Sequence, residues 1–196
     1  MKALLIGSHP AMDFFNTTMS PGGTPIELIG DGQAFVEWLV DAGLLDAPNA
    51  AKVKRRFGSE PLDAVAAEAR RFREWAGDWV FRWHHAPEAD YGTEVRRLNR
   101  LLEREHRYDE IVVADGVQTV ERWHLDSPDA LIGLVARQVA LLITTERPEL
   151  VKRCAGPECT LAFLDRTKAR RRIYCSATGC GNRAKVAAFR ERQRQQ

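Results

Sequence analysis

The longest regular pattern of apolar and polar positions runs from Pro61 to His85. Its apolar members follow one another at intervals of three and four residues: Leu62, Val65, Ala69, Phe72, Ala76, Trp79 and Trp83. Intervals of this kind place side chains along one side of an α-helix. Pro61 suits the first helical turn, where its missing N–H costs no hydrogen bond. The pattern therefore predicts one long helix over 61–85 that buries one side against a core.

Shorter stretches with the same spacing predict helices on either side of it. Phe35 and Leu39 follow Asp31, whose side chain can cap a helix over about 32–42. Another helix is indicated by four apolar positions further on: Tyr91, Val95, Leu98 and Leu102. The stretch PDALIGLVARQVALLITTE, which follows Ser127, is apolar on most helical faces and predicts a central, buried helix.

Two places favour extended structure instead. The segment YDEIVVADGVQTVERWHL carries β-branched residues on both sides of Asp-Gly, a pair that favours a tight hairpin turn. Antiparallel strands are therefore predicted at about 109–114 and 117–124. Near the N-terminus, we expect a short strand at about 11–17, followed by a turn.

Together these elements predict a mainly α fold with a small antiparallel β-hairpin. At 196 residues the chain suits one full domain with a small appendage. The composition changes near 148–153, so we place a mostly helical N-terminal domain at 1–148 and a smaller C-terminal module at 149–196. With 44% hydrophobic and 29% charged residues, the chain is expected to be globular, which excludes disordered and fibrous classes.

Charge is distributed unevenly between these two parts. Residues 151–196 hold twelve Lys or Arg against three acids, a net charge of +9. The remaining residues hold 17 basic and 24 acidic side chains, a net charge of −7. So large an asymmetry within a chain of net charge +2 indicates a polyanionic partner for the C-terminal module.

The cysteines of the chain gather in this module as two pairs, Cys154 with Cys159 and Cys175 with Cys180. Each pair brackets four residues, and 15 residues separate the two pairs. Two thiolates at such spacing can bind one tetrahedral ion from a tight turn, and a second pair completes the coordination. Zn²⁺ is therefore the predicted cofactor, and a closed set of four thiolates predicts a structural role. Free thiols, two disulfides and an iron–sulfur cluster are the alternatives.

The expected compartment bears on that choice. No apolar run near the N-terminus is long enough for a signal sequence or a membrane span. We therefore expect a cytoplasmic protein without a membrane partner. Cytoplasmic thiols stay reduced, which favours a metal site over disulfides.

The sequence around the cysteines also predicts how the module folds. TLAFL and RRRIY are expected to pair as the strands of a hairpin with DRTKA as its turn, which brings the second cysteine pair over the first. A helix is expected to start at the last cysteine. A knuckle, a hairpin and a helix together make a treble-clef-like zinc finger.

Basic side chains surround the predicted metal site. The candidate DNA contacts are Arg166, Lys168, Arg170, Arg171, Arg172, Arg183, Lys185, Arg190 and Arg194. Such a surface attracts DNA phosphates, and binding releases the counterions that surround DNA. The resulting affinity does not depend on the base sequence. Val186 and Phe189 face another direction of the last helix and are expected to pack on the zinc unit. The alternative is a solvated tail whose charge only keeps the protein soluble.

The stretch CSATGCGNRAK resembles the CGNR zinc-finger family through Cys180, Gly181, Asn182 and Arg183. The first cysteine pair, the strand FLD at 163–165 and the basic run before the third cysteine are similar to that family as well. The resemblance covers about 150–190 and implies a zinc finger that binds DNA.

Upstream, HPAMDFFNTT resembles the opening of the ABATE domain, which typically precedes this finger. Asp13, Asn16 and Thr17 fit the pattern of that domain, whereas Met12 and Phe15 stand where it has aliphatic residues. The resemblance implies a bacterial, stress-linked transcription regulator with the upstream domain as its sensor.

Other residues allow more than one interpretation. The aromatic side of the long helix and the basic face at 96–104 are candidates for binding a small-molecule effector, with core packing and solvated ion pairs as the alternatives. Asp13 and Asn16 either bind a ligand or form a buried polar staple. No histidine metal motif, glycine-rich phosphate loop or nucleophile elbow occurs in the sequence, so we expect no enzymatic activity.

These observations predict a regulator that binds DNA through a zinc finger and a basic helix, with an effector at the helical domain and a homodimer as one arrangement. The alternative is a zinc-stabilised module that contacts protein or RNA, with the helical domain as a dimerisation scaffold. A complex with DNA depends on salt, which separates the two hypotheses.

Overall fold

The structure is a computed structural model that describes residues 3–20, 24–104 and 106–195. Two helices form its centre: α4 (Ser59–His85) and α6 (Ala130–Thr145). The predicted apolar side of α4 is buried, apart from the partly buried Trp83 near its end, and α6 is buried on most of its faces. Both predictions are confirmed, because the spacing of apolar residues decided which sides could be covered. No helix among the described residues is long and apolar enough to cross a membrane.

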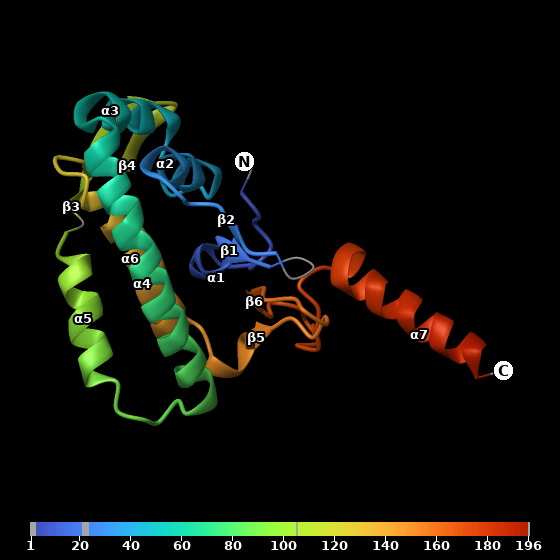
Figure 1. Ribbon diagram of the computed structural model, residues 1–196. Helices are drawn as coiled ribbons and strands as arrows, with labels where there is room; N and C mark the ends of the chain where they lie inside the picture. The colour runs from blue at the N-terminus through green and yellow to red at the C-terminus, as the bar shows by residue number, and fades with distance from the viewer. Residues whose placement is uncertain (1–2, 21–23, 105, 196) are drawn as a thin grey trace.

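The shorter helices pack around this pair (Figure 1). They are α2 (Gly32–Asp41), α3 (Ala47–Phe57) and α5 (Gly92–Leu102). Asp31 caps α2 as expected, since its carboxylate accepts a hydrogen bond of 2.7 Å from the N–H of Ala34. The sequence pattern did not predict α3, which buries little more than Ala50 and Val53.

The expected strand near the N-terminus is wrong, because residues 10–15 form helix α1 (Pro10–Phe15). His9 caps it: its Nδ1 accepts a hydrogen bond of 3.1 Å from the N–H of Ala11, and Pro10 occupies the first position. The remaining residues of α1 are all buried. The stretch therefore shows no periodic pattern of apolar and polar positions that would have distinguished a helix from a strand. Strand β1 (Thr18–Met19) follows and pairs antiparallel with β2 (Ile26–Glu27).

The predicted hairpin is present as β3 (His106–Ala114) and β4 (Gly116–His124), paired antiparallel from end to end. Gly116 has a φ of +117°, which only glycine adopts readily, and this explains the Asp-Gly pair at the turn. Ile111, Val113 and Val117 near the tip are exposed.

The C-terminal module pairs its strands differently from the prediction. Its elements are a short 3₁₀ turn (Pro148–Leu150), β5 (Val151–Arg153), β6 (Ala162–Leu164), a π-helical turn (Ala177–Gly181) and α7 (Asn182–Arg194). TLAFL supplies β6, but β6 pairs with β5 and not with RRRIY, which is not a strand.

Burial explains this pairing. Val151, Ala162 and Leu164 belong to the same buried cluster as α1 and α6, whereas the arginine-rich RRRIY segment would bring charge into that cluster. Beside the strands, Asp165 donates its N–H to the carbonyl of Leu150 at 2.7 Å. The packing thus crosses residue 148, while the division into sequence domains stays a prediction.

Figure 1 shows the consequence for the shape of the molecule. Strands β5 and β6 lie beside α1, and α7 projects away from the rest of the chain with none of its residues buried. The expectation that Val186 and Phe189 pack on the zinc unit is therefore wrong, since they are 41% and 57% exposed. Their helix begins directly after the last cysteine and projects away from the other described elements (Figure 1).

Candidate metal centre

The two cysteine pairs, which are 15 residues apart in sequence, come together in the module. Their Sγ atoms all lie within 4.8 Å of one another. Cys175 Sγ is 3.9 Å from Cys159 Sγ and 3.6 Å from Cys180 Sγ. A tetrahedral zinc ion with Zn–S bonds of about 2.3 Å needs sulfur atoms about 3.8 Å apart. The sulfur positions therefore fit one zinc ion, as the spacing predicted.

The first knuckle depends on a glycine. Gly156 accepts a hydrogen bond of 3.1 Å from the N–H of Cys159, which closes the turn between the first two ligands. A Cβ atom at this position would lie 3.0 Å from Cys180 Sγ and 3.4 Å from Cys154 Sγ. A side chain here would require the Cys180 side chain to shift by a few tenths of an ångström.

The second knuckle is shaped by the serine after Cys175. Ser176 Oγ accepts a hydrogen bond of 3.1 Å from Gly179 N–H, and Ser176 O accepts one of 2.9 Å from Gly181 N–H. The turn from Ala177 to Gly181 places Cys180 at the site and passes directly into α7. The predicted start of the helix at the last ligand is confirmed.

Donors point at the sulfur atoms, as thiolate ligands require. Cys154 Sγ accepts from the N–H groups of Cys175 at 3.2 Å and Gly156 at 3.4 Å. Arg183 donates to Cys180 Sγ at 3.0 Å. These donors compensate negative charge that would otherwise accumulate on four thiolates around one ion.

The thiols differ in acidity. Burial raises the pKa of Cys159 and of Cys175, and the neighbouring sulfur atoms add to the effect. Burial acts in the same direction on Cys180, but hydrogen bonds from Arg183 and the other thiols outweigh it and lower its pKa. Zinc must displace the remaining protons, so its affinity is expected to rise with pH.

The same distances decide between the alternatives for the cysteines. Every Sγ contact quoted above is far longer than a disulfide bond of about 2 Å, so the cysteines are not paired as disulfides. A cluster of several iron atoms would hold the sulfurs further apart than a single ion does. Among the described residues, these cysteines are the one group of three or more Cys, His, Asp or Glu side chains arranged to hold a metal.

Arg172, one of the predicted DNA contacts, binds inside the protein. Its guanidinium lies over the ring of Phe163 at 4.0 Å. It donates to the carbonyls of Tyr174 and Ile6 at 3.0 Å each, and to Cys175 O. These contacts fix the segment before the third ligand against the N-terminal segment that contains Ile6, and they leave the guanidinium of Arg172 fully engaged inside the protein.

Asp165 anchors the same segment from the other side. It is fully buried and accepts hydrogen bonds from Lys152 Nζ at 2.6 Å, Thr167 Oγ1 at 2.6 Å and Arg172 N–H at 2.9 Å. Burial works to raise its pKa, but these donors outweigh burial and lower the pKa to about 2. The FLD motif thus ends in a carboxylate that holds the loop after β6.

The other predicted DNA contacts lie at the surface. Those with no ion pair among the described residues are Lys168, Arg170, Arg171, Lys185, Arg190 and Arg194, which we call the cationic surface. Arg166 is also exposed but pairs with Glu146, and Arg183 is committed to Cys180. The structure therefore divides the predicted set into exposed and occupied side chains.

The polar residues of the N-terminal motif all have internal partners. Asp13 accepts the N–H of Gly7 at 2.6 Å, and burial raises its pKa. Asn16 Oδ1 accepts the N–H of Ala162 at 2.8 Å, while its Nδ2 donates to Ala162 O at 2.8 Å. Both residues form a buried polar staple, and Asn16 binds the free edge of β6.

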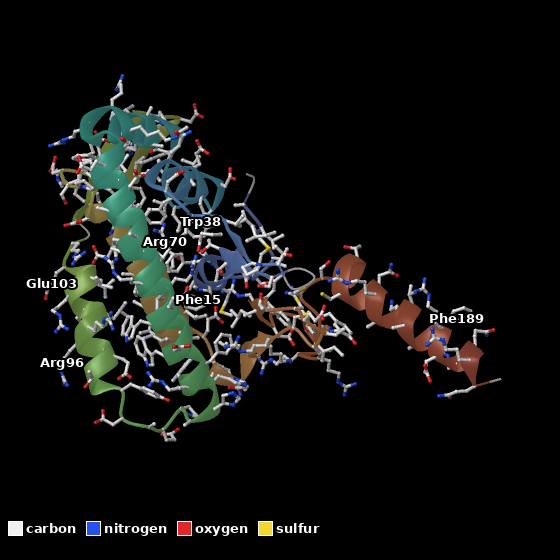
Figure 2. The ribbon with its side chains drawn as sticks, viewed as in Figure 1. Phe15, Trp38, Arg70, Arg96, Glu103 and Phe189 are labelled. Carbon is white, nitrogen blue, oxygen red and sulfur yellow. The ribbon has the colours of Figure 1, made fainter. Side chains whose placement is uncertain are left out.

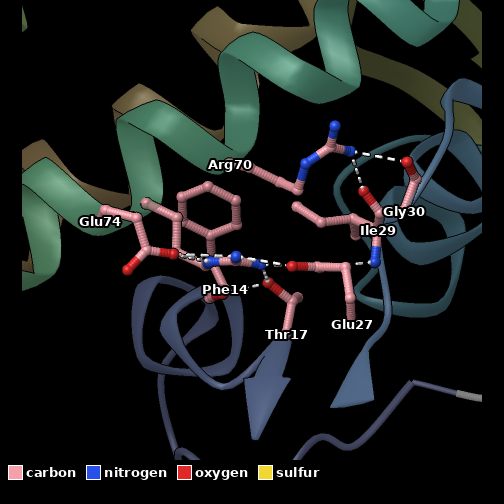
Figure 3. A network of polar contacts seen from close by, with 8 residues as sticks. Phe14, Thr17, Glu27, Ile29, Gly30, Arg70 and Glu74 are labelled. Carbon is pink, nitrogen blue, oxygen red and sulfur yellow. Dashed lines mark hydrogen bonds and ion pairs between the residues drawn. The ribbon is translucent and has the colours of Figure 1, made fainter. Parts of the chain in front are cut away.

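Thr17 joins a buried network around Arg73, whose surroundings are drawn in Figure 3. Arg73 donates to Thr17 Oγ1 at 2.8 Å, to Glu27 at 2.7 and 2.8 Å and to Glu74 at 2.9 Å. Arg70, on the same helix, donates to the carbonyls of residues 29 and 30. The sequence pattern did not reveal this buried arginine, because it lies beside the apolar side of α4.

Two family models match this chain and together cover most of its length. The family model described as "Putative stress-induced transcription regulator", that of the ABATE domain, matches residues 8–146. The model described as "CGNR zinc finger" matches residues 151–193. A search of curated proteins found no match.

Proposed function

Because the chain belongs to the ABATE family and carries a CGNR zinc finger at its C-terminal end, we propose that it regulates transcription by binding DNA through the cationic surface. Zinc has a structural role in this proposal: it fixes the loop after β6 and the start of α7 relative to each other. The proposal assigns the protein to the bacterial cytoplasm and gives it no enzymatic activity.

The exposure of α7 carries this proposal. The helix is 13 residues long, has no buried residue and includes five basic side chains against the acid Glu191. Helices of about this length are marginal in water without tertiary contacts. A partner that supplies negative charge along the helix would stabilise it, and a DNA backbone does so.

The cationic surface also has two separate sources. Lys168, Arg170 and Arg171 belong to the loop after β6, whereas Lys185, Arg190 and Arg194 belong to α7. Zinc joins the two segments, since Cys175 and Cys180 lie between them. DNA can contact both segments at once only if the metal keeps them at a fixed distance from each other.

Control by an effector at the helical domain is the second part of the proposal. The zinc module is joined to that domain by contacts between well-separated segments: Asn16 with Ala162, Arg172 with Ile6, and Leu164 N–H with Gly7 O at 2.8 Å. A change in the N-terminal segment would therefore reach the loop that carries the basic residues.

The alternative, a module that contacts protein, is favoured by one observation. Val186 and Phe189 are exposed on α7, and Phe189 is visible far out on that helix in Figure 2. An apolar pair on a free helix is typical of helix docking into a groove. Under this alternative, Phe189→Ala abolishes the complex and the complex withstands salt.

The test of the proposal is the affinity of the zinc-loaded full chain for duplex DNA as a function of salt. About six phosphate contacts predict a slope of log affinity against log salt near −5. Binding of single-stranded RNA with equal or higher affinity at every salt concentration would favour the RNA alternative. No measurable DNA affinity at low salt would refute the proposal.

A further inference from the structure

A cleft between α4 and α5 concentrates positive charge in the otherwise acidic helical domain. Its volume is about 280 Å³. Its lining includes four arginines, one carboxylate and one aromatic ring: Arg71, Arg97, Arg100, Arg104, Glu68 and Phe72. Four guanidinium groups thus face one carboxylate, although residues 1–150 carry a net charge of −7.

The cleft follows from how α5 packs. Leu98 is buried, and α5 makes its main helix contacts with α6. Arg97, Arg100 and Arg104 are three and four residues apart, so they lie on one side of the helix, the side that faces the cleft. Long side chains thus line a gap between α4 and α5.

Two of the four arginines are held in place by internal partners. The guanidinium of Arg97 lies over the ring of Trp75 at 4.4 Å. Arg104 pairs with Glu68 at 2.7 Å. These two side chains form the frame of the cleft, and Glu68 is committed to Arg104.

The other two arginines lack such partners. Within residues 3–20, 24–104 and 106–195, neither Arg71 nor Arg100 forms an ion pair with an acidic side chain. They come from different helices, one from each wall of the cleft. Guanidinium groups are planar donors that match phosphate oxygens in pairs.

We propose that this cleft binds a compact phosphate anion of the size of pyrophosphate, gripped between Arg71 and Arg100. The volume lies at the lower limit for small-molecule pockets, so a phosphate chain fits and a whole nucleotide does not. The buried ring of Phe72 forms part of the lining. The site does not depend on DNA binding, since it uses none of the residues of the cationic surface.

The experiment is isothermal titration of the zinc-loaded full chain with inorganic pyrophosphate and, separately, with ADP. We expect saturable binding of pyrophosphate at one site per chain. We expect ADP to bind within about threefold of pyrophosphate, because only its phosphates enter the cleft. ADP that binds more than tenfold tighter would overturn the assignment of the site to phosphate alone.

Variants locate the site. Arg71→Ala and Arg100→Ala should each weaken pyrophosphate binding about tenfold to a hundredfold, as expected for charge-assisted hydrogen bonds. Both residues are exposed, so the variants should fold. Arg96→Ala is the matched control, since Figure 2 shows Arg96 on the side of α5 that faces away from α4.

Three results would overturn the proposal. The first is an absence of saturable pyrophosphate binding to the wild-type chain. The second is an equal loss in Arg96→Ala and Arg100→Ala, which would indicate general electrostatic attraction. The third is a loss of pyrophosphate binding in the double variant Arg170→Ala/Arg171→Ala, because we expect this variant, altered only on the cationic surface, to retain binding.

Discussion

Asn16 and Ala162 exchange two hydrogen bonds of 2.8 Å each across 146 residues of sequence. The amide of Asn16 thereby acts as a short neighbouring strand for β6, whose other edge pairs with β5. Both partners are buried. The zinc module is therefore attached to the helical domain at a buried point. If the Asn16 amide were removed, water could not replace its hydrogen bonds.

Removal of this amide should destabilise the protein. Asn16→Ala leaves the buried N–H and carbonyl of Ala162 without partners, which is expected to cost about 2 to 4 kcal/mol. Denaturant unfolding followed by tryptophan fluorescence measures it. Asn99→Ala, at an exposed position of α5, is the control and should change the stability by less than about 0.5 kcal/mol. Equal effects at the two positions would contradict the account.

Two adjacent arginines of the basic run, Arg171 and Arg172, should differ in their effect on stability. Arg172→Ala removes the stack on Phe163 and several hydrogen bonds, and it should destabilise the module by about 2 to 4 kcal/mol. Arg171→Ala removes an exposed side chain and should leave stability unchanged. Thermal unfolding of the two variants checks this, and similar melting temperatures would show that Arg172 is not a structural residue.

Replacement of exposed arginines should weaken DNA binding without changing the stability of the protein. The double variant Arg170→Ala/Arg171→Ala is expected to flatten the dependence of log affinity on log salt by about 2, because two phosphate contacts are lost. Its unfolding curve should match that of the wild type. An unaltered slope would mean that these side chains do not contact phosphates.

His9 should make stability depend on pH. Burial is the main cause that lowers its pKa to about 4, and the charge of Arg166 acts in the same direction against the weaker, opposite effect of Glu146. The unfolded chain takes up a proton near pH 6.5 while the folded chain does not, so stability is full above that pH and falls between about 6.5 and 4.

The substitution His9→Asn tests this reasoning. Asparagine can cap α1 but does not titrate, so the variant should lose stability less steeply than the wild type between pH 6.5 and 4. Unfolding free energies at several pH values in this range give the comparison. Zinc release at low pH affects both proteins alike, so parallel curves would exclude His9 as the source.

The sequence predicted those features that depend on local pattern. The seam of α4 and the cap at Asp31 identify helices because neighbouring residues alone determine them. The spacing of the four cysteines identified the metal site for the same reason, since each knuckle is a tight turn. The Asp-Gly pair likewise fixed the hairpin at Gly116.

Features that depend on distant partners could not be predicted in this way. Nothing next to Ala162 in sequence reveals that Asn16 binds it. The strand partner of β6 was predicted wrongly because β5 packs into the same buried cluster as α1 and α6, which the local pattern does not show. Arg172 is indistinguishable from its basic neighbours until Ile6 lies beside it. Phe189 was expected to be covered because apolar residues usually are, but it is 57% exposed on a helix that projects away from the rest of the described chain.

The coordination of the metal is the most direct test of the account. X-ray absorption spectroscopy at the zinc edge, with metal analysis of the purified full chain, should find one zinc ion per chain bound by four sulfur atoms at about 2.3 Å. Oxygen or nitrogen ligands in place of sulfur, or a chain that folds with its four thiols free of any metal, would contradict it.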